Sequence, residues 1–446
     1  MLVIIHGWSD SWEGMTNLAR QLVKHGAADR VAHIRLGDYV SMSDEVTFPD
    51  LAAAMQRAWR EKGLPDEPRS VDLAVHSTGA PVARQWMVQY HEPDACPVKH
   101  LLMLAPANFG SPQAHKGRSF LGRLVKGFKA DKPFQTGSRV LKGLELASPF
   151  TWDLAERDVF AGDFRFGPGR VLATVLIGDT GYDGIRAMAN QEGSDGTVRI
   201  AAANLNADRL DVDFASDPQR PSLSLRSRAG RAAFCRVPGD NHSTIAAKGR
   251  WSPRNREAME LMARALTVSD DDFDGWCAEL DERNRREIAF GAGELQTHGF
   301  QHTVLLVEDD QGHPVSEYYL ELFSRSAERD DEHADLTRFL QEKVLRHVHV
   351  YGDAPQYRSF LVDCTALGQK FGQRNGPPVS LSISAQPELA ENGDVGYRTF
   401  GWDDIGDLDF DPSSQRDMFR PDRTLMVRLV IHREQAEHLF RLRDAD

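Results

Sequence analysis

The feature of this chain that most constrains its fold is an alternation of short apolar runs with amphipathic stretches over its first two thirds. The apolar runs have the length of buried strands, and the stretches between them carry apolar side chains at helical spacing. Strands that alternate with helices predict a parallel sheet covered by helices on both faces, and so an α/β fold. We expect strands at 2–5, 71–75, 101–105, 171–177 and 232–237, and helices at 15–25, 51–59 and 80–90.

The sequence pattern changes after this region, at the acidic run Ser269-Asp270-Asp271-Asp272. Beyond a charged helix expected at 276–288 the pattern turns to strands, and the segment DDQG at 309–312 is typical of a hairpin turn. With 446 residues the chain is long enough for more than one domain. We predict an α/β domain over 1–268 with an insertion at 113–150, an acidic linker and connecting helix over 269–295, and a mostly-β, antiparallel, sandwich-like domain over 296–446.

The net charge of the chain differs in sign on the two sides of this boundary. Residues 267–446 hold 19 Lys and Arg against 36 Asp and Glu, a net charge of −17, and the rest of the chain sums to +4. This acidity argues against nucleic acid as a partner of the C-terminal part, which we expect to engage a protein instead. The cysteines form no CxxC pair, so neither a disulfide scaffold nor a metal site is expected from Cys96, Cys235, Cys277 and Cys364.

The apolar runs are too short to place the chain in a membrane. None approaches the roughly 18 residues that a membrane-spanning helix needs. The first run, at 2–5, is also too short to form the core of a signal peptide. We expect a cytoplasmic protein, or one exported without a cleaved signal peptide.

The strongest chemical signal is the segment VDLAVHSTGA at 71–80, where an apolar strand leads into Ser77 and a helix begins at once. A turn this sharp strains the serine backbone and projects the hydroxyl above the sheet, as in a nucleophile elbow. Gly79 lets the helix approach the strand, whereas Val75 stands where the G-x-S-x-G pattern has its first glycine. The alternative is an ordinary strand–turn–helix junction in which Ser77 caps the helix.

Further motifs follow the other predicted strands. The segment HGW at 6–8 follows the first strand, LAPANFGSP at 104–112 follows the third, and GDNHST at 239–244 follows the last. Asp179 comes directly after the strand at 171–177, and Asp195 lies further along in GSDGTV at 193–198. With Ser77, these motifs make residues 1–266 resemble α/β-hydrolases of the bacterial lipase and phospholipase type.

This resemblance implies a Ser–Asp–His triad in which Ser77 is the nucleophile and His242 the base. For the acid we prefer Asp195, because its segment is similar to the Asp-Gly-x-Val stretch that carries the acid in many bacterial lipases, and Asp179 is the alternative. The implied reaction is ester hydrolysis through an acyl-enzyme, without a cofactor or a metal. The oxyanion hole would be formed by backbone N–H groups of Gly7, Trp8 and Thr78.

Residues 113–150 fall where lipases of this type insert a lid or cap. On a helical projection part of this segment has an apolar face opposite a basic face, a pattern typical of a helix that lies in a membrane interface. The alternative is a lid whose apolar side only covers the active site. The apolar face consists of Phe120, Leu121, Leu124, Val125 and Phe128, and the basic face of Arg118, Arg123, Lys126 and Lys129.

The sequence therefore predicts a serine hydrolase that cleaves carboxylic ester bonds of membrane lipids, phospholipids first, with peripheral contact to an anionic membrane surface. Two alternatives stay open. One is a soluble carboxylesterase or thioesterase whose lid shapes an acyl pocket. The other is a catalytically silent hydrolase scaffold that acts through its acidic C-terminal domain, against which the intact order of serine, acid and histidine argues.

Overall fold

The computed structural model describes residues 1–6, 12–41, 43–114, 137–184, 187, 190–247, 255–288, 298–324, 330–371, 379–385, 406, 408–410 and 418–433. The chain forms two units. The first comprises residues 1–207, 228–289 and 422–424, and the second comprises the remaining residues. Within the described ranges no helix is long and apolar enough to cross a membrane.

The first unit is built on a six-stranded sheet in the order β2-β1-β3-β4-β5-β8, and all its neighbouring strands are parallel. Every residue of β5 is buried, as are residues 2–5 of β1. Continuous apolar strands are expected where both faces of a parallel sheet are covered. The strands are β1 (Leu2–His6), β2 (Val31–Arg35), β3 (Val71–His76), β4 (Val98–Leu104), β5 (Leu172–Gly178) and β8 (Ala233–Val237).

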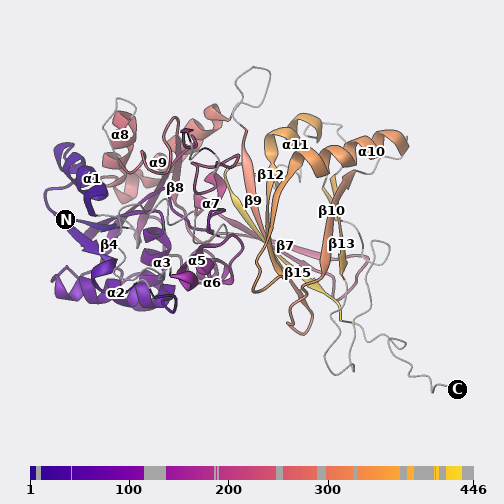
Figure 1. Cartoon of the computed structure of the whole chain (residues 1–446), viewed down its shortest axis with the longest axis horizontal. Helices are drawn as coiled ribbons and strands as arrows, with labels where there is room; N and C mark the ends of the chain where they lie inside the picture. The colour runs from indigo at the N-terminus through magenta and orange to yellow at the C-terminus, as the bar shows by residue number, and fades with distance from the viewer. Residues whose placement is uncertain are drawn as a thin grey trace. The chain divides into compact units, whose positions relative to one another are not determined.

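Helices cover both faces of this sheet. In Figure 1, α1, α8 and α9 lie above its strands, and α2 and α3 lie below them. The predicted parallel sheet between helical layers is thus confirmed. The helices are α1 (Trp12–Lys24), α2 (Phe48–Glu61), α3 (Gly79–Tyr90), α5 (Ser138–Leu144), α6 (Pro149–Asp158), α7 (Ile200–Ala203), α8 (Asn255–Ala265) and α9 (Asp270–Glu287), with a 3₁₀ turn at Leu36–Asp38.

The acidic run predicted to begin a linker instead forms the first turn of α9. The Ser269 side chain caps this helix by accepting from the backbone N–H of Asp272. Carboxylates in a first helical turn are favourable because they face the positive end of the helix dipole. Trp276 of α9 is buried, and the side-chain amide of Asn284 donates to the backbone oxygen of Phe234 in β8. The helix therefore packs against the sheet of the first unit.

The described strands of the second unit form two sheets, ordered β11-β12-β9-β15-β6-β7 and β10-β13-β14. The predicted β-rich C-terminal region is confirmed, but the larger sheet is mixed, because β15 pairs with β6 in parallel. Its helical elements are α10 (Asp330–Phe339), a π-helical turn (Leu340–Val344) and α11 (Cys364–Phe371). The strands are β6 (Asp208–Asp213), β7 (Ser222–Ser227), β9 (Phe300–Asp309), β10 (Tyr318–Ser324), β11 (Leu345–Val350), β12 (Tyr357–Asp363), β13 (Val379–Ala385), β14 (Leu408–Phe410) and β15 (Thr424–Ile431).

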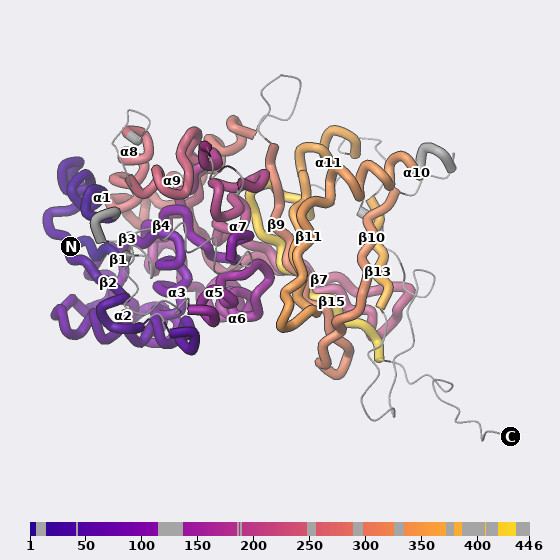
Figure 2. Tube along the Cα trace, viewed as in Figure 1, coloured from indigo at the N-terminus to yellow at the C-terminus, as the bar shows by residue number. Residues whose placement is uncertain are grey.

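The hairpin of β6 and β7 comes from the middle of the chain. The sequence-based boundary placed it with the α/β domain, yet residues 208–227 belong to the second unit. Figure 2 shows β7 among the orange strands of the C-terminal part. Leu210 and Val212 of β6 join a buried apolar cluster with Leu305 of β9 and Leu425 and Val427 of β15. This shared core explains why the hairpin completes the second sheet.

Candidate active site

Ser77 lies at the turn between β3 and α3, with a left-handed backbone angle φ of +54°. Its backbone N–H donates to the carbonyl oxygen of Leu104 at the end of β4, at 3.0 Å. Such a φ is rare for a non-glycine residue and marks a strained turn of the kind that presents a nucleophile. Thr78 occupies the cap position of α3. Ser77 therefore does not cap the helix, and its hydroxyl contacts another residue.

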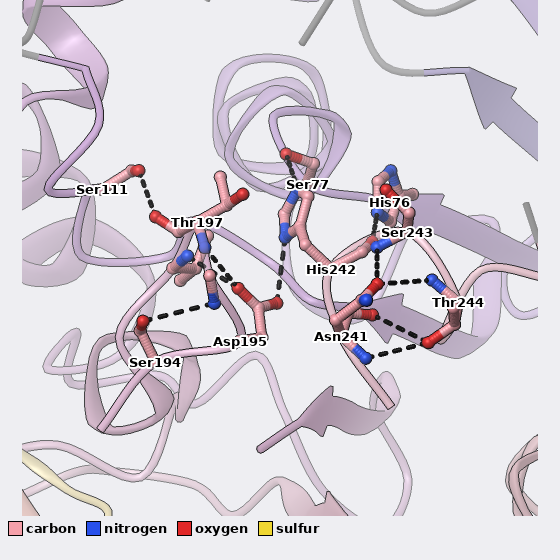
Figure 3. A network of polar contacts seen from close by, with 12 residues as sticks. His76, Ser77, Ser111, Ser194, Asp195, Thr197, Asn241, His242, Ser243 and Thr244 are labelled. Carbon is pink, nitrogen blue, oxygen red and sulfur yellow. Dashed lines mark hydrogen bonds and ion pairs between the residues drawn. The ribbon is translucent and has the colours of Figure 1, made fainter. Parts of the chain in front are cut away.

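That partner is His242, on the loop that follows β8. Its Nε2 lies 3.0 Å from the Ser77 Oγ, and its Nδ1 lies 2.9 Å from Oδ2 of Asp195, as Figure 3 shows. The carboxylate accepts a hydrogen bond from Nδ1–H, which leaves Nε2 as the acceptor for the serine hydroxyl. The imidazole is thus oriented to remove the proton of Ser77.

Asp195 is fully buried, and both its carboxylate and its backbone oxygen accept hydrogen bonds from backbone N–H groups. Its Oδ1 accepts from the N–H groups of Thr197 at 2.9 Å and Val198 at 2.8 Å, which leaves Oδ2 for the imidazole. Its backbone oxygen accepts from the N–H of His242 at 3.0 Å. The Ser111 hydroxyl in turn donates to the backbone oxygen of Thr197 at 2.6 Å, which anchors this loop to the segment after β4.

Asp179, the alternative acid, has a different position in the structure. Its Oδ1 accepts from the backbone N–H of Gly239 at 2.9 Å and from the Thr180 hydroxyl at 3.1 Å. Its carboxylate therefore fastens the beginning of the His242 loop to the end of β5. The His242 Nδ1–H donates to Oδ2 of Asp195 instead.

Comparison with solved structures gives the fold of the whole chain. Phospholipase PlaB from Legionella pneumophila superposes with a TM-score of 0.77 at 23% identity, covering 100% of this chain and 96% of that chain. The chain has an α/β-hydrolase fold. PlaB in complex with thio-NAD gives a TM-score of 0.78 at 23% identity over 100% and 97% of the two chains.

A smaller similarity concerns Bacillus licheniformis lipase BlEst2 in mature form. It covers 60% of this chain and 91% of that chain, at 18% identity and a TM-score of 0.38. No protein-family model matches this chain, and no curated protein matches its sequence.

Of the predicted oxyanion-hole residues, Thr78 lies within the described part of the chain. Thr78 is half-buried at the start of α3, and no described residue accepts a hydrogen bond from its backbone N–H. An N–H group at a helix start, directly after the nucleophile, is suited to stabilise a developing oxyanion. The other two predicted contributors, Gly7 and Trp8, lie outside the described residues, as do the predicted lid residues Phe120, Leu121, Arg123, Leu124, Lys126, Phe128 and Lys129.

The sequence did not predict a buried ion pair on α3, the helix that follows Ser77. Arg84 of α3 and Asp158 of α6 are both fully buried and form two hydrogen bonds, of 2.7 and 2.8 Å. Arg84 also donates to the backbone oxygen of Asn108 at 2.9 Å. This network ties α3 to α6 and to the segment after β4. A lone arginine in an apolar helical stretch was the available signal, but nothing in the sequence names its partner.

His76 is a second residue of the site that the sequence did not predict. It ends β3, directly before Ser77, and is buried. Its Nε2 lies 2.9 Å from the backbone oxygen of His242. The signal for it was a polar residue at the end of an otherwise apolar strand. Within the described part of the chain, no group of three or more His, Cys, Asp or Glu side chains is arranged to hold a metal ion.

Proposed function

We propose that the chain is a serine hydrolase that cleaves carboxylic ester bonds of membrane lipids, phospholipids above all. The observation that carries this proposal is the hydrogen-bonded series from Ser77 through His242 to Asp195, with distances of 3.0 and 2.9 Å. A half-buried serine on a strained turn, a base in contact with it and a buried acid behind the base make the arrangement that activates a serine hydroxyl.

The first half of the reaction follows from this geometry. His242 Nε2 takes the hydroxyl proton while Ser77 Oγ attacks the ester carbonyl carbon. The resulting oxyanion is stabilised by backbone N–H groups, among which we propose that of Thr78. The carboxylate of Asp195 stabilises the imidazolium that forms. When the tetrahedral intermediate collapses, the imidazolium returns its proton to the leaving alcohol, and the acyl group stays on Ser77.

The second half repeats these steps with water. His242 removes a proton from a water molecule, which attacks the acyl carbonyl and forms a second oxyanion at the same place. Collapse releases the fatty acid, and the proton on the imidazole returns to Ser77 Oγ. Every proton that moves is held by Nε2 of His242, and each step uses only groups of the chain and water.

The lipid substrate is supported by two further observations. PlaB, which shares the fold over the whole chain, bears the name of a phospholipase. The predicted lid also has a strongly basic sequence, since residues 116–142 hold eight Lys and Arg against one Asp. Each basic residue close to an anionic lipid surface contributes about 1 kcal/mol of binding free energy. We therefore propose that the protein binds the surface of anionic membranes, and that its acidic C-terminal part engages a protein partner.

Mass spectrometry of lipid products tests the substrate class. Vesicles of a mixed bacterial lipid extract are incubated with the protein, with the Ser77→Ala variant as the control. We expect free fatty acid and lysophospholipid to accumulate with the unaltered protein only. Hydrolysis restricted to short soluble esters or thioesters would instead identify a soluble esterase or thioesterase. Absence of hydrolysis with every substrate would identify a silent scaffold.

A further inference from the structure

His76 touches the base of the triad without belonging to it. Its Nε2 lies 2.9 Å from the backbone oxygen of His242, and its ring lies against the His242 ring, with the centroids 4.8 Å apart and the planes tilted by 51°. Figure 3 shows the two residues beside each other. A carbonyl oxygen can only accept, so Nε2 of His76 carries a proton and donates it to this bond. His76 is 2% exposed, so water does not compete for the carbonyl.

This hydrogen bond is the second one that holds the backbone of His242. On one side the backbone N–H of His242 donates to the backbone oxygen of Asp195 at 3.0 Å. On the other side its carbonyl accepts from His76. The backbone of the base is therefore held once by the acid and once by the residue next to the nucleophile. Because His76 is bonded directly to Ser77, a movement of the His242 loop away from the serine also stretches the His76 hydrogen bond.

We propose that His76 is a positioning residue, which holds His242 Nε2 at hydrogen-bond distance from Ser77 Oγ. This inference rests on the proposed serine-hydrolase function. In the proposed reaction the imidazole gains and loses a proton twice, and it exchanges partners between the serine, the leaving alcohol and water. A base that changes partners needs a fixed backbone, and two hydrogen bonds to its peptide groups supply one. His76 does not touch the reacting atoms, so its effect passes through His242.

A second buried histidine provides a matched control. His100 of β4 is 4% exposed, and its Nε2 lies 2.8 Å from the backbone oxygen of Val268, the same type of bond as that of His76. It lies near the start of its strand, where it pairs with Asp72 of β3, whereas His76 ends β3 next to Ser77. A substitution at His100 therefore removes a buried hydrogen bond of the same type, together with the contact to Asp72, near the end of the strands opposite to Ser77.

The experiment compares variants that keep or remove the donor at position 76. His76→Gln keeps a side-chain N–H that reaches to a similar distance, whereas His76→Phe keeps an aromatic ring and His76→Met keeps the length, both without a donor. His100→Phe is the control. For each folded variant we measure the rate at which a fluorophosphonate probe labels Ser77, kcat and KM for a short soluble ester, and the midpoint of thermal unfolding.

We expect both donor-free variants at position 76 to lose on the order of 10- to 100-fold in labelling rate and in kcat, the range that a small misplacement of a catalytic group produces. KM should stay within about twofold, because the lost interaction acts on the transition state. His76→Gln should recover most of the rate. His100→Phe should lower the unfolding midpoint and leave the labelling rate unchanged.

The outcomes separate this inference from the function on which it rests. If the unaltered protein neither reacts with the probe nor hydrolyses any ester, the proposed function fails. If it reacts, but the Phe or Met variant is labelled at the unaltered rate, the function stands and the role of His76 is refuted. Equal losses in His76→Gln and in the donor-free variants would also refute it, because the hydrogen bond would then not be the cause.

Discussion

Replacing Gly178 with alanine tests how tightly the end of β5 fixes the loop that carries His242. A Cβ at Gly178 would lie 2.0 Å from the backbone oxygen of Asp240 and 2.4 Å from its carbonyl carbon. Ordinary van der Waals contact begins at 3.4 Å, so the two segments must separate by about 1.4 Å. Because Asp240 lies two residues before His242, we expect the imidazole to move away from the Ser77 hydroxyl by a comparable distance.

The expected effect follows from this displacement. A misplacement of about 1 Å in a catalytic arrangement costs on the order of 100-fold in rate, so kcat for a short ester should fall by about that factor in Gly178→Ala. Overpacking should also lower the free energy of unfolding by about 1–3 kcal/mol. Steady-state kinetics and chemical denaturation measure the two effects separately, at a temperature where the variant is folded.

Gly275→Ala is the matched control for this substitution. Gly275 lies on an exposed part of α9, where an added Cβ meets no atom within 4 Å, so this variant should keep the unaltered rate and be at least as stable. Unaltered kcat in Gly178→Ala would show that the close approach of β5 to Asp240 does not set the position of the base.

Two further predictions concern the acid and the basic segment. Asp195→Asn should lower kcat by about three to four orders of magnitude, because the imidazole loses its orienting carboxylate. Asp179→Asn should retain most activity, because its side-chain oxygen still accepts from the Gly239 N–H. A reversed ranking of the two variants in steady-state kinetics would assign the role of the acid to Asp179. Reversing Arg123, Lys126 and Lys129 to Glu should remove a preference for anionic over zwitterionic vesicles while hydrolysis of a soluble ester continues. The same preference in the unaltered protein should weaken as salt shortens the roughly 10 Å screening length. Equal loss of both activities in the triple variant would show that the segment acts as a structural cap instead.

The parallel sheet and the meeting of Ser77, Asp195 and His242 were accessible from the sequence because both depend on local patterns. The central strands are largely apolar runs, and the three polar residues follow the ends of such runs directly or after an excursion. The carboxyl ends of parallel strands meet at one edge of a sheet, so side chains that follow different strands converge there. The order of strands and loops along the chain therefore predicts which of these side chains meet at the site.

Other features depend on contacts between distant residues and left no local signal. β6 pairs with β15, about 200 residues later in the chain, and its alternating pattern fits the edge of an α/β sheet as well as a β-rich unit. The acidic start of α9 resembles a linker in composition, and only its packing against β8 shows that it belongs to the first unit. The contact of His76 with His242 joins residues 166 positions apart, and a histidine before a serine does not by itself indicate such a bond.

Covalent labelling determines whether Ser77 is a nucleophile activated by His242. The protein is treated with a fluorophosphonate probe, and the labelled peptide is identified by mass spectrometry. We expect a single labelled residue, Ser77, with labelling abolished in Ser77→Ala and strongly slowed in His242→Ala. Labelling of Ser243, or full ester hydrolysis by the Ser77→Ala variant, would contradict this role of Ser77.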